Sequence, residues 1–199
     1  MRKWSVLLTV LILAGFGVRT AQAQDNTKVP SWEVGGGYTY RNYAFGNIDQ
    51  GPTRVSMNGW GVMMDYMIFK KWLSVAAQAD GTYSNTIYST QVYSAMAGPQ
   101  FYPFGHRRLT VYAHVLFGEG FAHFVVPASG GFPSLGESSH AYAWQGGGGV
   151  DYAWKPHWTI RLIQADYEDT RFFGATPSQS NLKITVGVMY RFGKLKRGR

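Results

Sequence analysis

Residues 182–192 read Leu-Lys-Ile-Thr-Val-Gly-Val-Met-Tyr-Arg-Phe, and the alternation of side chains in this stretch decides the fold. One face of such a segment carries Leu182, Ile184, Val186, Val188, Tyr190 and Phe192. The other face carries Lys183, Thr185, Gly187, Met189 and Arg191. A period of two residues predicts a β-strand with one apolar and one polar face. An apolar face of this length needs either lipid or a large core to cover it.

The same alternation recurs along the chain and predicts seven further strands. Their ranges are 32–40, 55–69, 72–83, 92–102, 109–121, 140–154 and 158–168. Eight strands of roughly ten residues match the length that crosses a bilayer at about 45° of tilt. Arg161 and Gln164 have opposite parity, so we expect a β-bulge between them. Glu119 falls on the apolar face, which predicts that it lies above the bilayer or follows a bulge.

The connections between the predicted strands alternate in length. Short basic links occupy 70–71, 103–108 and 155–157, whereas the longest links occupy 41–53, 125–139 and 169–181. Aromatic residues gather at both ends of the strands, as they do at the two interfaces of a membrane. A soluble β-sandwich or a lipocalin-like barrel is the alternative, but it would bury its large rings centrally. The sequence therefore predicts an all-β, eight-stranded antiparallel transmembrane up-and-down barrel, with both mature termini in the periplasm.

The two ends of the chain differ from the barrel in composition. A basic start, an apolar core and Ala21-Gln22-Ala23 predict a cleaved signal peptide over 1–23, which leaves a barrel over 24–192 and a basic tail over 193–199. Removing the three basic residues of 1–23 takes the net charge from +8 to +5, and the tail holds four of those five. Because the body is then only about +1, nucleic-acid binding is not expected. The absence of cysteine excludes disulfides and thiolate metal sites.

Several charged side chains fall on the polar face of the predicted strands. The candidate interior network consists of Glu33, Asp65, Asp80, His114, Asp151, Arg161, Lys183 and Arg191. Side chains nearly fill the interior of an eight-stranded barrel, and charges buried there must be paired. Two interpretations stay open, a polar plug that closes the barrel or a switchable gate for a narrow ion or water path. In the second, Arg161 and Lys183 face the aspartates of the network.

The last strand also carries a recognisable motif. Thr185-x-Gly187-x-x-Tyr190-x-Phe192 resembles the polar-x-Gly-x-x-aromatic-x-aromatic signal that the barrel-assembly machinery reads. The whole mature chain resembles the small eight-stranded outer-membrane β-barrel family, the OmpA/OmpX-like or porin-like group, and 97–101 and 111–118 share this resemblance. The resemblance implies a monomer in the outer membrane of a Gram-negative bacterium, in contact with outer-membrane lipids. Seven residues follow Phe192, which departs from the family pattern, and no peptidoglycan-binding domain follows.

Three classes of function remain for such a barrel. A structural or small porin-like role without catalysis is the main prediction. Surface adhesion or binding of an extracellular ligand is the alternative, because the predicted loops contain Tyr43, Phe45, Phe132, Phe172 and Phe173. Lipid-A-modifying enzymes are also eight-stranded barrels, but here no His is followed two residues later by Ser. The five His lack the spacing of metal ligands, and neither a cofactor nor a metal is expected.

Overall fold

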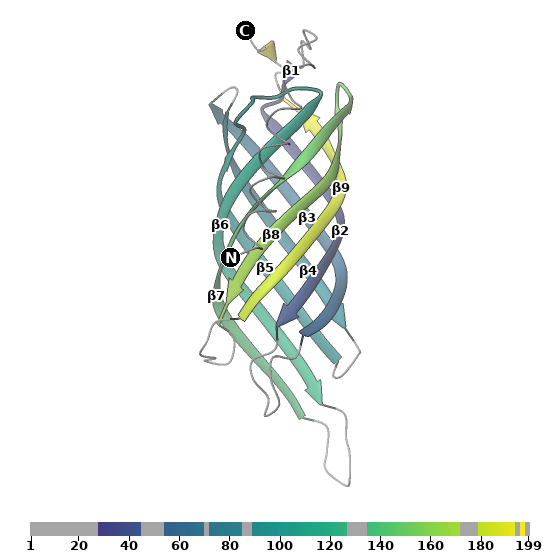
Figure 1. The fold of residues 1–199 in the computed structure, drawn as a ribbon, viewed down its shortest axis with the longest axis vertical. Helices are drawn as coiled ribbons and strands as arrows, with labels where there is room; N and C mark the ends of the chain where they lie inside the picture. The colour runs from purple at the N-terminus through teal and green to yellow at the C-terminus, as the bar shows by residue number, and fades with distance from the viewer. Residues whose placement is uncertain are drawn as a thin grey trace, which may run out of the picture.

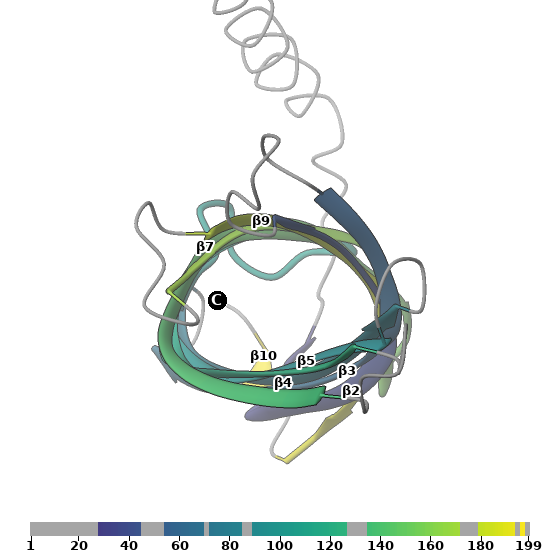
Figure 2. The same ribbon diagram turned by 90° about the horizontal axis from the view of Figure 1, so that it is seen from below.

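Eight antiparallel strands close into a barrel in their sequence order (Figures 1 and 2). The computed structural model describes residues 28–44, 54–69, 72–84, 89–126, 135–171, 179–193 and 196–197. The wall consists of β2 (Trp32–Ala44), β3 (Arg54–Phe69), β4 (Leu73–Ser84), β5 (Ser89–Phe101), β6 (Leu109–Val126), β7 (Leu135–Lys155), β8 (Trp158–Thr170) and β9 (Gln179–Phe192). Pairing of β2 with β9 closes the ring. A helix of the length and hydropathy needed to span a bilayer does not occur in the described part of the chain.

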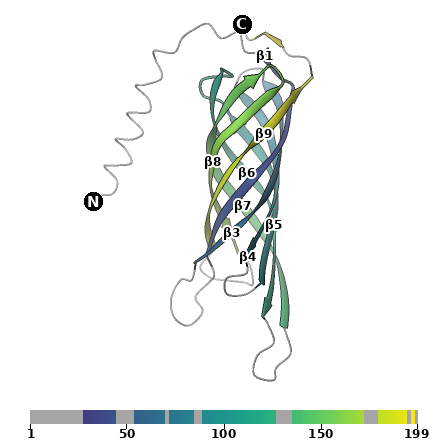
Figure 3. The same cartoon turned by 90° about the vertical axis from the view of Figure 1, so that its right-hand side faces the viewer.

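A second, two-stranded sheet lies beyond one end of the barrel (Figures 1 and 3). It pairs β1 (Lys28–Val29) with β10 (Lys196–Arg197). We call this end of the barrel the turn end, because the short connections β3–β4, β5–β6 and β7–β8 lie there. The opposite end is the loop end. The expected signal peptide over 1–23 lies outside the described residues.

Each of the eight predicted ranges falls on a barrel strand, so the predicted barrel is confirmed. The predicted loops were too long, however. Residues 41–44 belong to β2, which pairs up to Ala44↔Arg54, and 169–170 belong to β8, which pairs up to Thr170↔Gln179. Likewise β6 continues to Val126 and β7 begins at Leu135. Near the loop end outward-facing residues such as Asn42 and Asp169 are polar, so the alternation of hydropathy changes before the pairing ends.

Burial along each strand is inverted relative to a soluble protein. In β9, Leu182 is 47 % exposed whereas its neighbour Lys183 is 0 % exposed. The same inversion holds for β3, in which Trp60 and Val62 are exposed and Met63 and Asp65 are buried. A continuous exposed apolar surface of this kind indicates a wall that faces lipid, with a polar interior.

The bulge predicted in β8 is confirmed. Arg161 pairs with Gly187 and Gln164 pairs with Thr185, so one extra residue is accommodated between them. Leu162 and Ile163 therefore both face outward, and Arg161 and Gln164 both face inward. For Glu119 the bulge interpretation was wrong, because β6 pairs with β7 without a register shift and Glu119 lies exposed on the outer face.

Aromatic rings contact one another in two belts. At the turn end, Trp72 lies against Phe101 with ring centroids 5.8 Å apart, and Trp158 lies against Tyr190 at 5.0 Å. Toward the loop end, Tyr83 contacts Tyr93 at 5.8 Å. Two belts at two heights are the arrangement that amphipathic rings adopt at the interfaces of a bilayer.

The hairpin of β6 and β7 projects beyond the rest of the loop end (Figures 1 and 3). Its pairing runs from Leu109↔Tyr152 to Val126↔Leu135. Pairing of β7 with β8 begins only at Ala143↔Thr170. Among the described strands, 135–142 therefore pair with β6 only.

Candidate functional site

The interior of the barrel contains a dense set of charged side chains. All eight residues of the candidate network are buried there, with Lys183 at 0 % and His114, the most accessible of them, at 5 % exposure. The structure adds Arg41, Asp166 and Glu168, which are also buried. Sequence reasoning missed Arg41 because the first strand was predicted to end at Tyr40. It missed Asp166 and Glu168 because they follow the bulge, which reverses the parity of β8.

Four side chains form an ion-pair cluster across the lumen near the loop end: Arg41 of β2, Asp80 of β4, Glu168 of β8 and Lys183 of β9. Lys183 Nζ donates to Asp80 Oδ1 at 2.8 Å and lies 3.3 Å from Glu168 Oε2. Arg41 Nη2 bonds to Asp80 and, at 3.1 Å, to Glu168 Oε2. Because two cations alternate with two carboxylates, the cluster is electrically balanced.

A second cluster surrounds Arg161 near the turn end. Its Nε donates to Asp151 Oδ1 at 2.9 Å, and its Nη2 lies 3.5 Å from Asp65 Oδ2. The guanidinium carbon lies 4.5 Å from the ring centroid of Tyr112, in cation–π geometry. Arg191 forms a separate pair at this end, in which its Nε donates to Glu33 Oε1 at 2.6 Å. Arg161 and Lys183 thus both face aspartates.

Amide side chains and a histidine fill the space between the two clusters. His114 Nε2 lies 2.9 Å from Asp166 Oδ1, and Gln145 donates from Nε2 to Asp166 Oδ2 at 3.2 Å. Gln164 Nε2 donates to Asp166 Oδ2 at 2.6 Å and to Gln78 Oε1 at 3.0 Å. Gln145 Oε1 also accepts a bond from Lys183 Nζ at 2.6 Å, so the hydrogen-bonded network runs continuously along the lumen.

The interior carries more carboxylates than cations. Among the residues that the structure describes, the six buried carboxylates are Glu33, Asp65, Asp80, Asp151, Asp166 and Glu168, and the four buried cations are Arg41, Arg161, Lys183 and Arg191. The excess appears at Arg161, which contacts both Asp65 and Asp151, and at Asp166, whose partners are His114, Gln145 and Gln164. Within the described residues, Arg41 Nε and Nη1 have no hydrogen-bond partner, nor does Glu168 Oε1.

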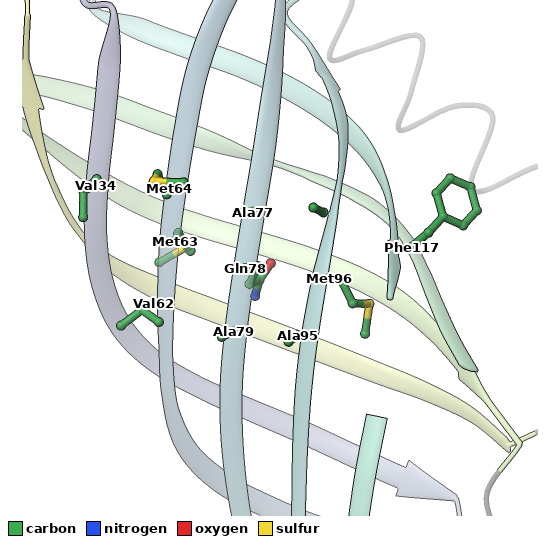
Figure 4. A pocket seen from close by; sticks show the side chains of 11 residues that line it. Val34, Val62, Met63, Met64, Ala77, Gln78, Ala79, Ala95, Met96 and Phe117 are labelled. Carbon is green, nitrogen blue, oxygen red and sulfur yellow. The ribbon is translucent and has the colours of Figure 1, made fainter. Parts of the chain in front are cut away.

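A shallow hollow of about 590 Å³ lies on the outer wall, where alanines replace larger side chains (Figure 4). Ala77 and Ala79 of β4 and Ala95 and Ala97 of β5 form its floor. Met63, Gln78 and Met96 also border it, but they are only 3–6 % exposed because they point into the barrel. The exposed residues of its lining, among them Val62, Met64 and Phe117, place the hollow on the lipid-facing side of the wall.

The described residues contain few other groups of side chains that could support catalysis or metal binding. His123 Nδ1 lies 2.8 Å from Ser138 Oγ on the exposed face of the β6–β7 hairpin. Among the side chains that the structure describes, Ser138 is the hydrogen-bond partner of His123. No group of three His, Asp or Glu suited to a metal occurs in the described part of the chain. Tyr43, predicted as a loop aromatic, is instead fully buried and donates to Gln179 Oε1 at 3.0 Å. Phe45, Phe132, Phe172 and Phe173 lie outside the described residues.

The residues of the expected assembly motif have structural contacts of their own. Thr185 Oγ1 lies 3.2 Å from Thr39 Oγ1 inside the barrel. A Cβ on Gly187 would lie 2.6 Å from the carbonyl oxygen of Gly36, so β2 and β9 approach closely at this point. Tyr190 and Phe192 contribute to the aromatic belt of the turn end.

The profile of the outer membrane protein beta-barrel domain matches residues 9–192. The chain belongs to this family. It is therefore an outer-membrane β-barrel of the Gram-negative type, and in such barrels the termini lie on the periplasmic side. The turn end is accordingly the periplasmic end, and the loop end is extracellular.

Solved structures of small outer-membrane barrels share the fold. Ail, the attachment invasion locus protein of Yersinia pestis, crystallised with the heparin analogue sucrose octasulfate, is 19% identical with a TM-score of 0.58, over 81% of this chain and 97% of Ail. Neisserial surface protein A is 14% identical with a TM-score of 0.58, over 81% of this chain and 97% of its own. OprG from Pseudomonas aeruginosa is 14% identical with a TM-score of 0.50, over 85% and 99%. No curated protein sequence matches the chain.

Proposed function

We propose that this outer-membrane barrel is a closed structural scaffold, without an open pore and without catalysis. The observation that carries the proposal is the ion-pair cluster of Arg41, Asp80, Glu168 and Lys183, which spans the lumen from four strands. A water-filled channel would require these side chains to lie against the wall. Their mutual contacts instead hold them across the axis.

The energy of separating such charges supports a plug over a gate. Leaving a buried charge without its partner costs about 3–5 kcal/mol. At the lower value, about one molecule in 150 would have a separated pair at any time. Because a second cluster around Arg161 blocks the same lumen, an open path requires both clusters to rearrange.

Conductance in a planar bilayer tests this proposal. The refolded mature protein is expected to insert, as judged by circular dichroism, and to produce no single-channel steps. Lys183→Ala serves to assign any steps to the interior, and Lys155→Ala, an exposed lysine outside the lumen, is the matched control. Reproducible steps in the wild type that Lys183→Ala alters and Lys155→Ala does not would overturn the plug in favour of the gate.

A second candidate function is the binding of a partner at the cell surface. The projecting β6–β7 hairpin favours it, because among the described strands 135–142 pair with β6 only, and pairing of β7 with β8 begins at Ala143. An extended segment of a partner can add to such an edge as a further strand. Replacing 119–142 with an Asn-Gly turn removes this segment together with the part of β6 that pairs with it, and is expected to abolish host-cell attachment while the barrel still folds.

The control for this test shortens a different loop. A Gly-Ser replacement of 172–178 is expected to leave attachment unchanged. Unchanged attachment after loss of the hairpin would contradict partner binding at this edge. Sucrose octasulfate, with which Ail was crystallised, is a suitable first probe of a surface ligand.

The proposed biogenesis of the protein follows the pattern of the family. The signal peptide over 1–23 directs export, and the barrel-assembly machinery reads Thr185, Gly187, Tyr190 and Phe192 during insertion. We further propose a monomer surrounded by outer-membrane lipids. Its support is the closed wall, in which every strand from β2 to β9 has a partner on both sides.

A further inference from the structure

Two basic side chains rest on aromatic rings at one corner of the periplasmic end. Arg108 Nη2 donates to the Tyr152 hydroxyl at 2.9 Å, and its guanidinium carbon lies 5.4 Å from the centroid of that ring. Lys155 Nζ lies 4.6 Å from the ring centroid of Trp154. Both Arg108 and Lys155 are exposed, so their charges remain available to a ligand.

The backbone of this corner is held in place. The carbonyl of Arg108 accepts a bond from Ala153 N at 2.8 Å, which ties the start of β6 to the end of β7. The hydroxyl of Thr110 donates to the Arg107 carbonyl at 2.8 Å and accepts from Arg107 N at 3.2 Å. Tyr152 and Trp154 lie two residues apart along β7, so the Cα atoms of the two residues that hold the cations are roughly 7 Å apart. Arg108 and Lys155 therefore rest on rings that belong to one short segment of a single strand.

The charge around this corner has one sign. In 101–113 and 150–160 the single carboxylate is Asp151, which is buried inside the barrel and bonded to Arg161. Leu109 and Trp154 point outward beside the cations and are 54 % and 57 % exposed. Because aromatic belts mark the edge of the hydrocarbon layer, Arg108 and Lys155 lie at the depth of the lipid headgroups.

We propose that Arg108, Tyr152, Trp154 and Lys155 form a binding site for the headgroup of an anionic phospholipid in the periplasmic leaflet. Arg108 and Lys155 contact the phosphate oxygens, since both are strong donors with positive charge. Trp154 packs against the glycerol and the upper part of the acyl chains. Because the two long side chains already rest on aromatic rings, they lose less conformational entropy when the lipid binds.

Native mass spectrometry of the folded protein tests this site. The protein is reconstituted in vesicles of equimolar phosphatidylglycerol and phosphatidylcholine, and the lipids retained after detergent extraction are counted. The wild type is expected to retain phosphatidylglycerol preferentially. Each cation near an anionic membrane surface contributes about fivefold to binding, so Arg108→Gln with Lys155→Gln is expected to lower that preference by more than tenfold.

The control variant is Arg54→Gln, which removes an exposed arginine from the extracellular end. It is expected to retain the wild-type preference, and all variants must show the heat-dependent gel mobility of a folded barrel. Equal retention of both lipids by the wild type would overturn the proposal. So would an undiminished preference in the double variant, or an equal loss in Arg54→Gln, which would assign the effect to overall charge.

Discussion

Among single residues, Arg161 of β8 connects its own strand to three others, β3, β6 and β7. Its side chain contacts Asp151 of β7, Asp65 of β3 and Tyr112 of β6. It reaches them because the bulge in β8 turns it inward together with Gln164, which accepts a bond from Arg161 Nη1 at 2.7 Å. One cation therefore lies between two carboxylates and reduces the repulsion between them.

Arg161→Met is expected to lower the free energy of unfolding by about 3–5 kcal/mol, because it leaves Asp65 and Asp151 buried without their cation. Urea unfolding in lipid vesicles, followed by tryptophan fluorescence, measures the change. Adding Asp151→Asn to the same chain is expected to recover part of the loss. Arg54→Met is the control, since an exposed substitution of this kind changes stability by about 0.5 kcal/mol or less. A loss for Arg161→Met no larger than that of the control would contradict the role assigned to Arg161.

Gly187 belongs to the proposed assembly motif and also lies where β2 and β9 approach closely. A Cβ there would lie 2.6 Å from the Gly36 carbonyl oxygen, whereas a Cβ on Gly36 would meet its nearest atom at 3.3 Å. Gly187→Ala is therefore expected to destabilise the refolded barrel by about 1–3 kcal/mol, and Gly36→Ala by much less. Refolding into vesicles without any assembly machinery measures the packing effect alone. Equal stability of both variants, with failure of Gly187→Ala only in cells, would assign the glycine to recognition instead.

Among the strands, the bulge in β8 determines where one residue can be deleted without preventing the barrel from folding. Removing Ile163 leaves Arg161 opposite Gly187 and Gln164 opposite Thr185, with one residue between them, as in a regular strand. The variant lacking Ile163 is expected to refold and to show heat-dependent gel mobility. Removing Val186 from the regular strand β9 reverses the faces on one side of the deletion, and that variant is expected not to fold. Folding of both deletions would show that register is not fixed by the two faces.

The strands were predictable because lipid on one side and a polar interior on the other impose a period of two on the sequence. The bulge was predictable for the same reason, since Arg161 and Gln164 break that period. Arg41 was not, because beyond Tyr40 the outward-facing residue is the polar Asn42, so the apolar face that marks the rest of β2 is interrupted. Tyr43 was predicted as an exposed loop residue, but it is fully buried in a hydrophobic cluster with Val55 and Met57 near the extracellular end.

The sequence predicted which charged side chains lie inside the barrel better than it predicted which of them pair with one another. The tilt of the strands decides which side chains meet across the lumen, and a single sequence does not give that tilt. Arg41 and Asp80, for example, come from strands that are not neighbours in the wall. The contacts of Arg108 and Lys155 with aromatic rings were not predicted either, because a short basic link is equally consistent with charges that are surrounded by water.

At the scale of the whole molecule, the absence of cysteine allows the orientation of the barrel to be tested directly. Gly136→Cys places one thiol on the exposed extracellular hairpin, and Pro156→Cys places one on an exposed periplasmic turn. In intact cells a membrane-impermeant maleimide is expected to label the first variant and not the second. Labelling of both after the outer membrane is permeabilised is the control. Labelling of Pro156→Cys in intact cells would indicate the reverse orientation.

The pairing of β1 with β10 has a consequence for the order of the chain. Because Lys28 lies opposite Arg197 while β2 already pairs with β9, the segments that flank the wall meet beside the seam of the ring. Every strand therefore keeps both of its neighbours wherever the polypeptide is considered to start. A circular permutant, joined at this small sheet and reopened in one of the extracellular connections, would have the same wall, so the architecture is independent of the point at which synthesis begins.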